Sequence, residues 1–173
     1  MDDYKKAIKF YSDNNENFEF GNKNSEHASI VVSQLFQFAK EEILIYSGTL
    51  NSQVTNDSHL IKQVNKYLES GGKLRLILDQ LPEKDARSEV LKQIIQSVDN
   101  TSRDVKYKVD SNNDFSQSLS TLFSDNQSHH FMVADKVAYR IETDKDKYEA
   151  FGNFNDKKVA MLFSQKFIEF IKD

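Results

Sequence analysis

The sequence predicts a fold of the α/β class: a three-layer α-β-α sandwich with a mixed, mostly parallel sheet and an antiparallel C-terminal end. Over the first two thirds of the chain, apolar residues at helical spacing alternate with short β-rich runs. Such alternation is typical of a parallel sheet covered by helices on its faces. In the last third, extended runs follow one another closely, as strands of antiparallel hairpins do.

This alternation predicts the helices and strands of the parallel part of the sheet. Helical spacing of apolar residues predicts helices within 26–39, 60–68 and 90–98, and a shorter one within 115–123. The second of these runs stops at Gly71 and Gly72, as a helix C-terminus commonly does. Between the helices, β-rich runs predict strands at 43–46, 74–78 and 105–109.

The last third predicts a hairpin and a closing helix. Two extended runs, 131–134 and 137–141, flank a two-residue turn at Asp135 and Lys136. A third extended run around 150–151 leads into a C-terminal helix. We therefore expect a single domain over 1–173, with a core at 25–173 and an N-terminal extension at 1–24.

Composition excludes several classes of function. The chain has 173 residues, and its 27 acidic and 23 basic residues give a net charge of −4, which argues against a general nucleic-acid coat protein. A small anion pocket, and with it nucleic-acid binding, stays open. The absence of cysteine excludes disulfides, thiolate catalysis and Cys-ligated metal sites.

The chain shows no targeting or membrane signal. Its first residues lack the apolar run of a signal peptide, and no later stretch reaches membrane-spanning length. We expect a soluble cytoplasmic protein with no membrane partner.

Two adjacent histidines, His129 and His130, precede the hairpin turn. Neighbouring residues on a strand point to opposite faces, so this pair is not expected to bind one metal ion. With the other histidines, His27 and His59, far away in sequence, we predict neither a metal site nor a cofactor.

Three segments carry a resemblance to a known family: "EEILIYSGTLN", "GGKLRLILD" and "SHHFMVADKVAYRIE". From about His27 to the C-terminal helix, the chain resembles the phospholipase D superfamily. The active-site motif of that family is His-x-Lys, then four residues, then Asp. Counting back from Asp135, the lysine position falls on His130 and the histidine position on Ser128, so the motif is degenerate.

The resemblance implies a loss of the family's chemistry. In the family, one histidine attacks phosphorus, a second one from another motif copy protonates the leaving group, and Lys and Asn hold the phosphate oxygens. Ser128 is a weak nucleophile without an adjacent base. His130 is the one candidate catalytic residue, as a base or an anion donor, and only if the protein is active.

The family also carries a Gly-Ser-x-Asn element after the aspartate, which this chain lacks at the usual spacing, where Glu142 stands. A near match, Gly152-Asn153-Phe154-Asn155, follows later. Either it is a displaced phosphate-binding element, with Asn153 and Asn155 as binding residues, or it is a strand that runs into a helix cap. We favour the cap.

Other polar residues have two interpretations each. Arg140 and Glu142 share one strand face, and either line a polar pocket beside His130 or form a cross-strand pair. Asp79 follows a predicted strand, where ligand crevices of α/β sheets form, but a turn or helix cap is the favoured interpretation. Tyr46 is interpreted as a core aromatic residue.

The leading functional hypothesis is a catalytically degenerate phospholipase D-like domain that acts as a binding or interaction module. Its candidate binding residues are Ser128, His130, Arg140, Glu142, Asn153 and Asn155. The alternative is an active homodimeric phosphodiesterase or nuclease that uses His130 from each subunit, because the chain carries one motif copy where the chemistry needs two. A third hypothesis is a partner-binding protein whose binding surface is a helix or a sheet edge, unrelated to the phosphate pocket of the family. The candidate partners are therefore a second copy of the chain, a phosphate-containing ligand or another protein.

Overall fold

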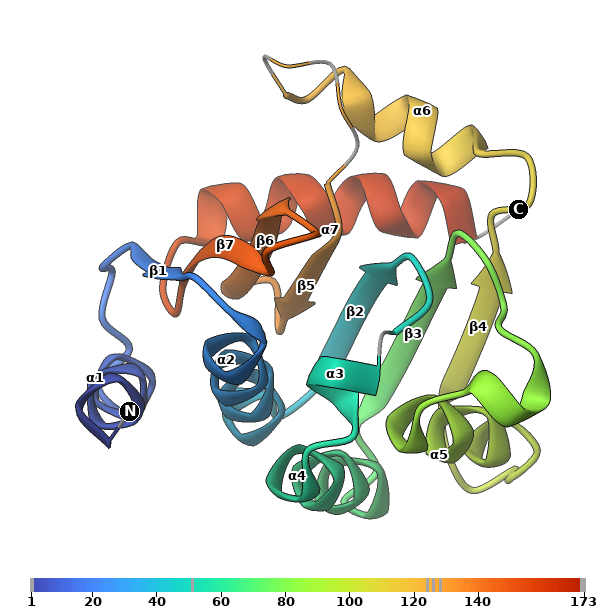
Figure 1. The fold of residues 1–173 in the computed structure, drawn as a ribbon, viewed down its shortest axis with the longest axis horizontal. Helices are drawn as coiled ribbons and strands as arrows, with labels where there is room; N and C mark the ends of the chain where they lie inside the picture. Colours follow the sequence, from blue (N-terminus) through green and yellow to red (C-terminus); the bar gives the residue numbers. More distant parts are fainter. Residues whose placement is uncertain (1, 51, 124, 126, 128, 172–173) are drawn as a thin grey trace.

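A seven-stranded sheet with helices on both faces forms the centre of the molecule (Figure 1). The computed structural model describes residues 2–50, 52–123, 125, 127 and 129–171. Within them the strands are β1 (Phe20–Asn22), β2 (Glu42–Ser47), β3 (Lys73–Leu78), β4 (Val105–Val109), β5 (Phe131–Ala134), β6 (Ala138–Asp144) and β7 (Glu149–Asn153). Their order across the sheet is β1-β7-β6-β5-β2-β3-β4. The predicted α/β class with a mixed sheet is confirmed.

Fewer pairs of neighbouring strands are parallel than the sequence predicts. Among the described strands it joins β2 to β3 and β3 to β4, whereas β2–β5, β5–β6, β6–β7 and β7–β1 are antiparallel. The expectation of a mostly parallel sheet is wrong for this reason: β5, β6 and β7 are joined by short turns, and such turns allow only antiparallel neighbours. Antiparallel strands therefore make up the larger part of the sheet.

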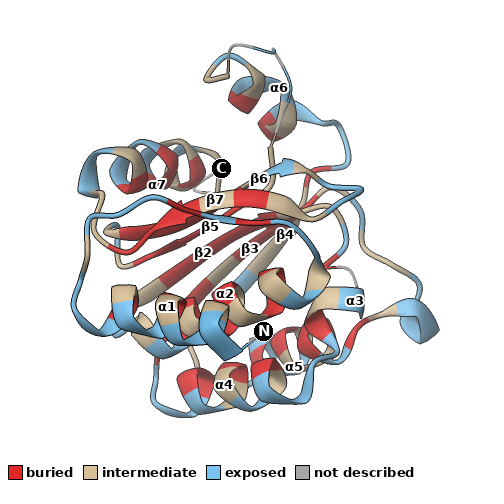
Figure 2. Cartoon of the chain, turned by 60° about the vertical axis from the view of Figure 1, so that its left-hand side comes forward, coloured by how far each residue is buried: buried red, intermediate tan, exposed pale blue. Residues whose placement is uncertain are grey.

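Helices cover the two faces of the sheet in separate layers (Figure 2). One face packs against α1 (Asp2–Asp13), α2 (Ser25–Phe38), α4 (Ser58–Glu69) and α5 (Glu89–Val98), and the other against α6 (Asp114–Ser120) and α7 (Lys157–Ile171). A short helix α3 (Ser52–Thr55) and a 3₁₀ turn (Lys84–Ala86) lie in the connections. Each predicted helix and strand of 25–173 is present, within a few residues of its expected ends.

Side-chain caps explain where the helices of the first layer begin. Asn24, Asp57 and Ser88 each accept a hydrogen bond from a backbone N–H of the first turn, at the start of α2, α4 and α5 respectively. The buried apolar residues of these helices then face the sheet. This layer, with the strands beneath it, builds the larger of two hydrophobic cores.

The N-terminal segment is part of the fold rather than an extension outside it. Helix α1 packs on α2 through the buried Ile8, and β1 pairs with β7 as an edge strand of the sheet. The Phe20 ring stacks against Phe154 at 5.3 Å between centroids. The boundary expected at residue 25 therefore does not separate two structural units. A strand of three residues gives too short a pattern for sequence periodicity to detect, so β1 was not predicted.

The turn between β5 and β6 is tied to the start of β2. Asp135 and Lys136 both adopt positive φ, 53° and 57°, as a two-residue hairpin turn requires. The Asp135 carboxylate accepts hydrogen bonds from the backbone N–H groups of Lys40, Glu41 and Glu42, at 2.8 to 2.9 Å. Asp135 thus holds β5 beside β2 and serves the architecture of the sheet.

Within the described residues, no helix combines the length and the apolar character needed to cross a bilayer.

The approach of β1 to β7 depends on the missing side chain of Gly152. A Cβ atom there would lie 2.6 Å from the Tyr139 carbonyl oxygen and 2.9 Å from the Phe20 ring. Gly152→Ala is therefore expected to lower the free energy of unfolding by about 1–3 kcal/mol through overpacking. Chemical denaturation measures this.

Gly21→Ala is the matched control on the partner strand, because its Cβ would come no closer than 3.8 Å to the Ala150 carbonyl oxygen. Equal losses in the two variants would contradict this account of how β1 joins the sheet.

Candidate functional site

Polar side chains gather where the carboxyl ends of β2 and β3 meet the start of β5 and the end of β6. Tyr46 pairs with Phe131 in the ladder between β2 and β5, and Asp79 directly follows β3. His130 directly precedes β5, and its carbonyl accepts a hydrogen bond from the Glu142 N–H of β6. The sheet topology therefore brings residues from four strands to one edge.

His130 lies at the centre of this cluster, between two carboxylates. Its Nε2 is 3.0 Å from Asp79 Oδ2, and its Nδ1 is 3.2 Å from Glu142 Oε2. The imidazole also meets the Tyr46 ring edge-on, at 5.2 Å between centroids. Gly48 leaves room for it, since a Cβ there would lie 3.1 Å from His130 Cε1. Both ring nitrogens are thus engaged by acidic side chains.

The cluster continues into a longer chain of polar contacts. The Tyr46 hydroxyl donates to Asp79 Oδ1 at 2.6 Å, and Arg140 Nη2 donates to Glu142 Oε1 at 3.2 Å. Arg140 Nε donates to Asn22 Oδ1 at 3.0 Å, which reaches edge strand β1. Acidic and basic groups therefore alternate from Asp79 through His130 and Glu142 to Arg140.

Burial and pairing set the protonation of the cluster. Burial alone would lower the pKa of His130, but the hydrogen bonds and negative charges of Asp79 and Glu142 outweigh it and raise this pKa to about 9. Burial raises the pKa of Asp79 and of Glu142, yet His130, with Tyr46 or Arg140, brings both below their usual range. At neutral pH the imidazole is therefore a cation that donates from both nitrogens.

A cavity of about 410 Å³ opens beside His130, on the face of the sheet covered by α2 to α5. Its polar end is lined by Asp79, His130, Arg140 and Glu142. Its apolar part is lined by Phe36, Leu50, Val54, Leu60 and Val90, among others. Small-molecule sites in proteins have this size and this mixture of apolar walls with a few polar groups.

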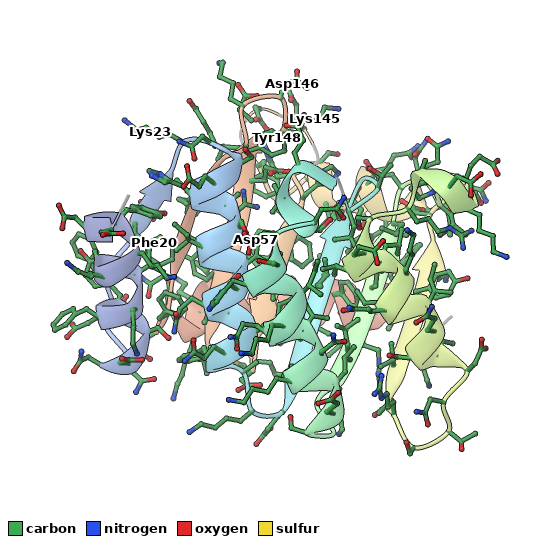
Figure 3. The ribbon with its side chains drawn as sticks, turned by 60° about the horizontal axis from the view of Figure 1, so that its bottom comes forward. Phe20, Lys23, Asp57, Lys145, Asp146 and Tyr148 are labelled. Carbon is green, nitrogen blue, oxygen red and sulfur yellow. The ribbon has the colours of Figure 1, made fainter. Side chains whose placement is uncertain are left out.

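The turn between β6 and β7 closes one side of the cavity. Lys145, Asp146 and Tyr148 of this turn line it, and Figure 3 shows them together at the end of the hairpin. The Tyr148 hydroxyl donates to Gln53 Oε1 of α3 at 2.9 Å. The Tyr148 carbonyl accepts from Arg140 Nη2, so the central cluster also positions this turn.

A second, more polar cavity of about 500 Å³ lies on the α6 side and shares Asp79, His130 and Glu142 with the first. Its lining also includes His129, whose Nε2 is 3.0 Å from Asp125 Oδ2. The two adjacent histidines therefore have separate partners. Within the described residues, no group of His, Asp and Glu side chains has the arrangement of a metal site.

Comparison with known proteins identifies the fold but no close relative. In sequence, the chain matches no family model and none of the curated proteins. In structure, it is similar to Nuc, a phospholipase D family member from Salmonella typhimurium, with a TM-score of 0.52, 14% identity, and coverage of 88% of this chain and 93% of that one. It is also similar to NucT from Helicobacter pylori, with a TM-score of 0.54, 11% identity, and coverage of 88% and 96%.

The chain has a phospholipase D-like fold. A further neighbour is TrmBL2, an archaeal chromatin protein whose structure shows a novel mode of DNA binding, with a TM-score of 0.60 and 14% identity. That similarity covers 99% of this chain, which spans only 60% of the TrmBL2 chain. At these identities the comparisons establish the phospholipase D-like fold alone.

Three of the residues singled out in the sequence lie together in the phospholipase D-like fold. His130, Arg140 and Glu142 line the 410 Å³ cavity, and Arg140 and Glu142 are also paired with each other along the same strand, β6. Ser128 lies outside the described residues.

Asn153 and Asn155 do not join this cluster. Asn153 pairs with Tyr139 at the far end of β7, and its Nδ2 donates to Asn17 Oδ1. Asn155 Nδ2 donates to the Asn15 carbonyl. The fold separates them from the cluster because β7 runs antiparallel to β6 and carries its last residues away from Glu142. The cap of α7 is Asp156, whose carboxylate accepts from the Lys158 and Val159 N–H groups.

Sequence reasoning missed Tyr46, Asp79, Asn22 and Tyr148 as parts of the site. Tyr46 lies in a hydrophobic core, as predicted, and its hydroxyl also reaches the site, whereas a cap is the favoured sequence interpretation of Asp79. Both residues stand at the carboxyl ends of parallel strands, which was the available signal. Asn22 and Tyr148 reach the site through the β1–β7 pairing and a turn with positive φ at Tyr148, 58°. Neither feature has a recognisable sequence pattern.

The raised pKa of His130 predicts a loss of stability at alkaline pH. An imidazole with a pKa of about 9 in the folded state and about 6.5 in the unfolded chain stabilises fully below pH 6.5, and this contribution is lost as the pH rises through 9. The loss should be on the order of 2–3 kcal/mol. Urea denaturation between pH 6 and 9.5 measures it.

His130→Gln should be less stable at pH 6 and should flatten the profile, whereas His59→Gln, on the exposed surface of α4, should keep the wild-type slope. A wild-type profile that is flat over this range would contradict the charged state assigned to His130.

Proposed function

We propose that this phospholipase D-like domain is a non-catalytic binding module that takes up a small molecule in the cavity beside His130. The observation that supports this most strongly is the engagement of both imidazole nitrogens by Asp79 and Glu142. The cavity beside them supplies the binding volume.

Nucleophilic attack on phosphorus needs an imidazole nitrogen with an available lone pair. With a pKa raised to about 9, His130 carries protons on both nitrogens at neutral pH, and each N–H points at a carboxylate. To act as a nucleophile or general base, the ring would first have to lose a proton that two negative charges stabilise. The same pairing that fixes His130 in place thus suppresses its reactivity.

The charge around the cavity does not favour a phosphodiester substrate either. Asp79 and Glu142 line the cavity and would repel phosphate oxygens. Arg140 is nearly fully buried and already paired with Glu142, so it offers little uncompensated positive charge. Lys145 brings one more positive charge to the lining from the exposed turn, where its neighbour Asp146 brings a negative one. DNA binding of the kind that the TrmBL2 structure shows for that protein has no support here from a chain of net charge −4.

The first test is hydrolysis. We expect no turnover above background with bis-p-nitrophenyl phosphate or single-stranded DNA, for the wild type and for His130→Ala alike, because neither has an available imidazole. Hydrolysis by the wild type that is lost in His130→Ala would overturn the proposal in favour of a phosphodiesterase. A dimeric mass in solution would then indicate a site shared between two copies.

A second test is binding itself. In a screen of small fragments by amide chemical shifts, we expect hits that perturb residues around the cavity, such as Leu50, Val54 and Tyr148. Hits confined to other surfaces, or no hits, would contradict the proposed binding function even if hydrolysis is absent.

A further inference from the structure

The cavity beside His130 is divided between an apolar part and a polar end, which restricts the chemistry of its occupant. Phe36 of α2, Val54 of α3, Leu60 of α4 and Val90 of α5 enclose the apolar part. A ligand that fills this part must bring an apolar body, since a polar group there would lose its hydration without a partner.

The four charged groups of the polar end are neutral as a whole, and the two other charged residues that line the cavity, Lys145 and Asp146, lie exposed on the β6–β7 turn and are opposite in charge. Asp79 and Glu142 are negative, and His130 and the guanidinium of Arg140 are positive. Each is paired with an opposite charge, at 3.0 to 3.2 Å. An anion or a cation that enters among these four groups would give up its hydration without gaining an unpaired counter-charge, and water screens the exposed charges of the turn. An uncharged ligand avoids that cost.

The same end has acceptor capacity left over. In the described part of the chain, each carboxylate oxygen of Asp79 and Glu142 accepts one hydrogen bond, from Tyr46, His130 or Arg140. A carboxylate oxygen has two acceptor sites, so each keeps one. The donors of His130, by contrast, are both used. A ligand with a hydrogen-bond donor can therefore bind to these carboxylates.

From these three properties we infer that the ligand is an uncharged molecule with a hydroxyl group on an apolar body. The hydroxyl donates to the carboxylate of Asp79 or Glu142, and the apolar body lies between α2, α3, α4 and the sheet. This inference rests on the proposed binding function and specifies the class of molecule bound.

Three phenols of similar size test the charge of the ligand: p-cresol, which is neutral at pH 7, tyramine, which is a cation, and 4-hydroxybenzoate, which is an anion. We expect p-cresol to bind at least about tenfold more tightly than either ion, because both ions carry a charge that the site does not compensate. Chemical-shift titration of the full chain at pH 7 gives the three dissociation constants.

Val54→Phe tests the position of the apolar body, because Val54 lines the apolar part and a larger ring there takes up space that the ligand needs. It should weaken p-cresol binding by about tenfold or more. Val98→Phe is the control, since Val98 lies exposed on α5 and does not line the cavity. It should bind p-cresol as the wild type does.

Binding of tyramine or 4-hydroxybenzoate as tight as that of p-cresol, or no binding by any of the three, would overturn the inferred class. So would Val54→Phe with undiminished affinity. None of these results affects the proposal of a non-catalytic binding module, which fails instead on hydrolysis or on a fragment screen without hits at the cavity.

Discussion

The imidazolium of His130, held between Asp79 and Glu142, is the interaction on which the arrangement of the site depends. It joins the segment after β3 to the segment before β5 and to β6, at one edge of the sheet. Through Arg140 the same network extends to Asn22 of β1 and to the turn that carries Tyr148. One charged group thus connects both halves of a sheet whose strands come from the whole length of the chain, and it forms the polar end of the cavity.

The same interaction stabilises the structure and lowers the reactivity of His130. An imidazole stabilised as a cation by two carboxylates is a strong electrostatic tie, but it has no lone pair for attack on phosphorus. Asp135 has a comparable role at the opposite end of β5, where its carboxylate binds backbone N–H groups that precede or begin β2. In both places, acidic side chains in segments that resemble the phospholipase D superfamily hold strands together.

Sequence patterns predicted most of the helices and strands, because long apolar periodicities and the stops at Gly71 and Gly72 are local signals. The position of Arg140 and Glu142 on one strand face was also predictable, from the two-residue period of a strand. The sequence did not predict how much of the sheet is antiparallel, where β1 lies or where Asn153 lies. These features depend on which strands pair, and local patterns do not show that. Asp79 could have been found by giving more weight to the carboxyl ends of parallel strands, where its neighbour across the sheet is the end of β2.

The protonation of His130 tests this account most directly. Titration of its ring by ¹⁵N-resolved NMR should give a pKa of about 9, with protons on both Nδ1 and Nε2 at pH 7. Titration near the ordinary histidine value of about 6.5, with one unprotonated nitrogen at pH 7, would contradict it. That result would mean that the carboxylates do not hold the ring as a cation and that His130 retains a lone pair for catalysis.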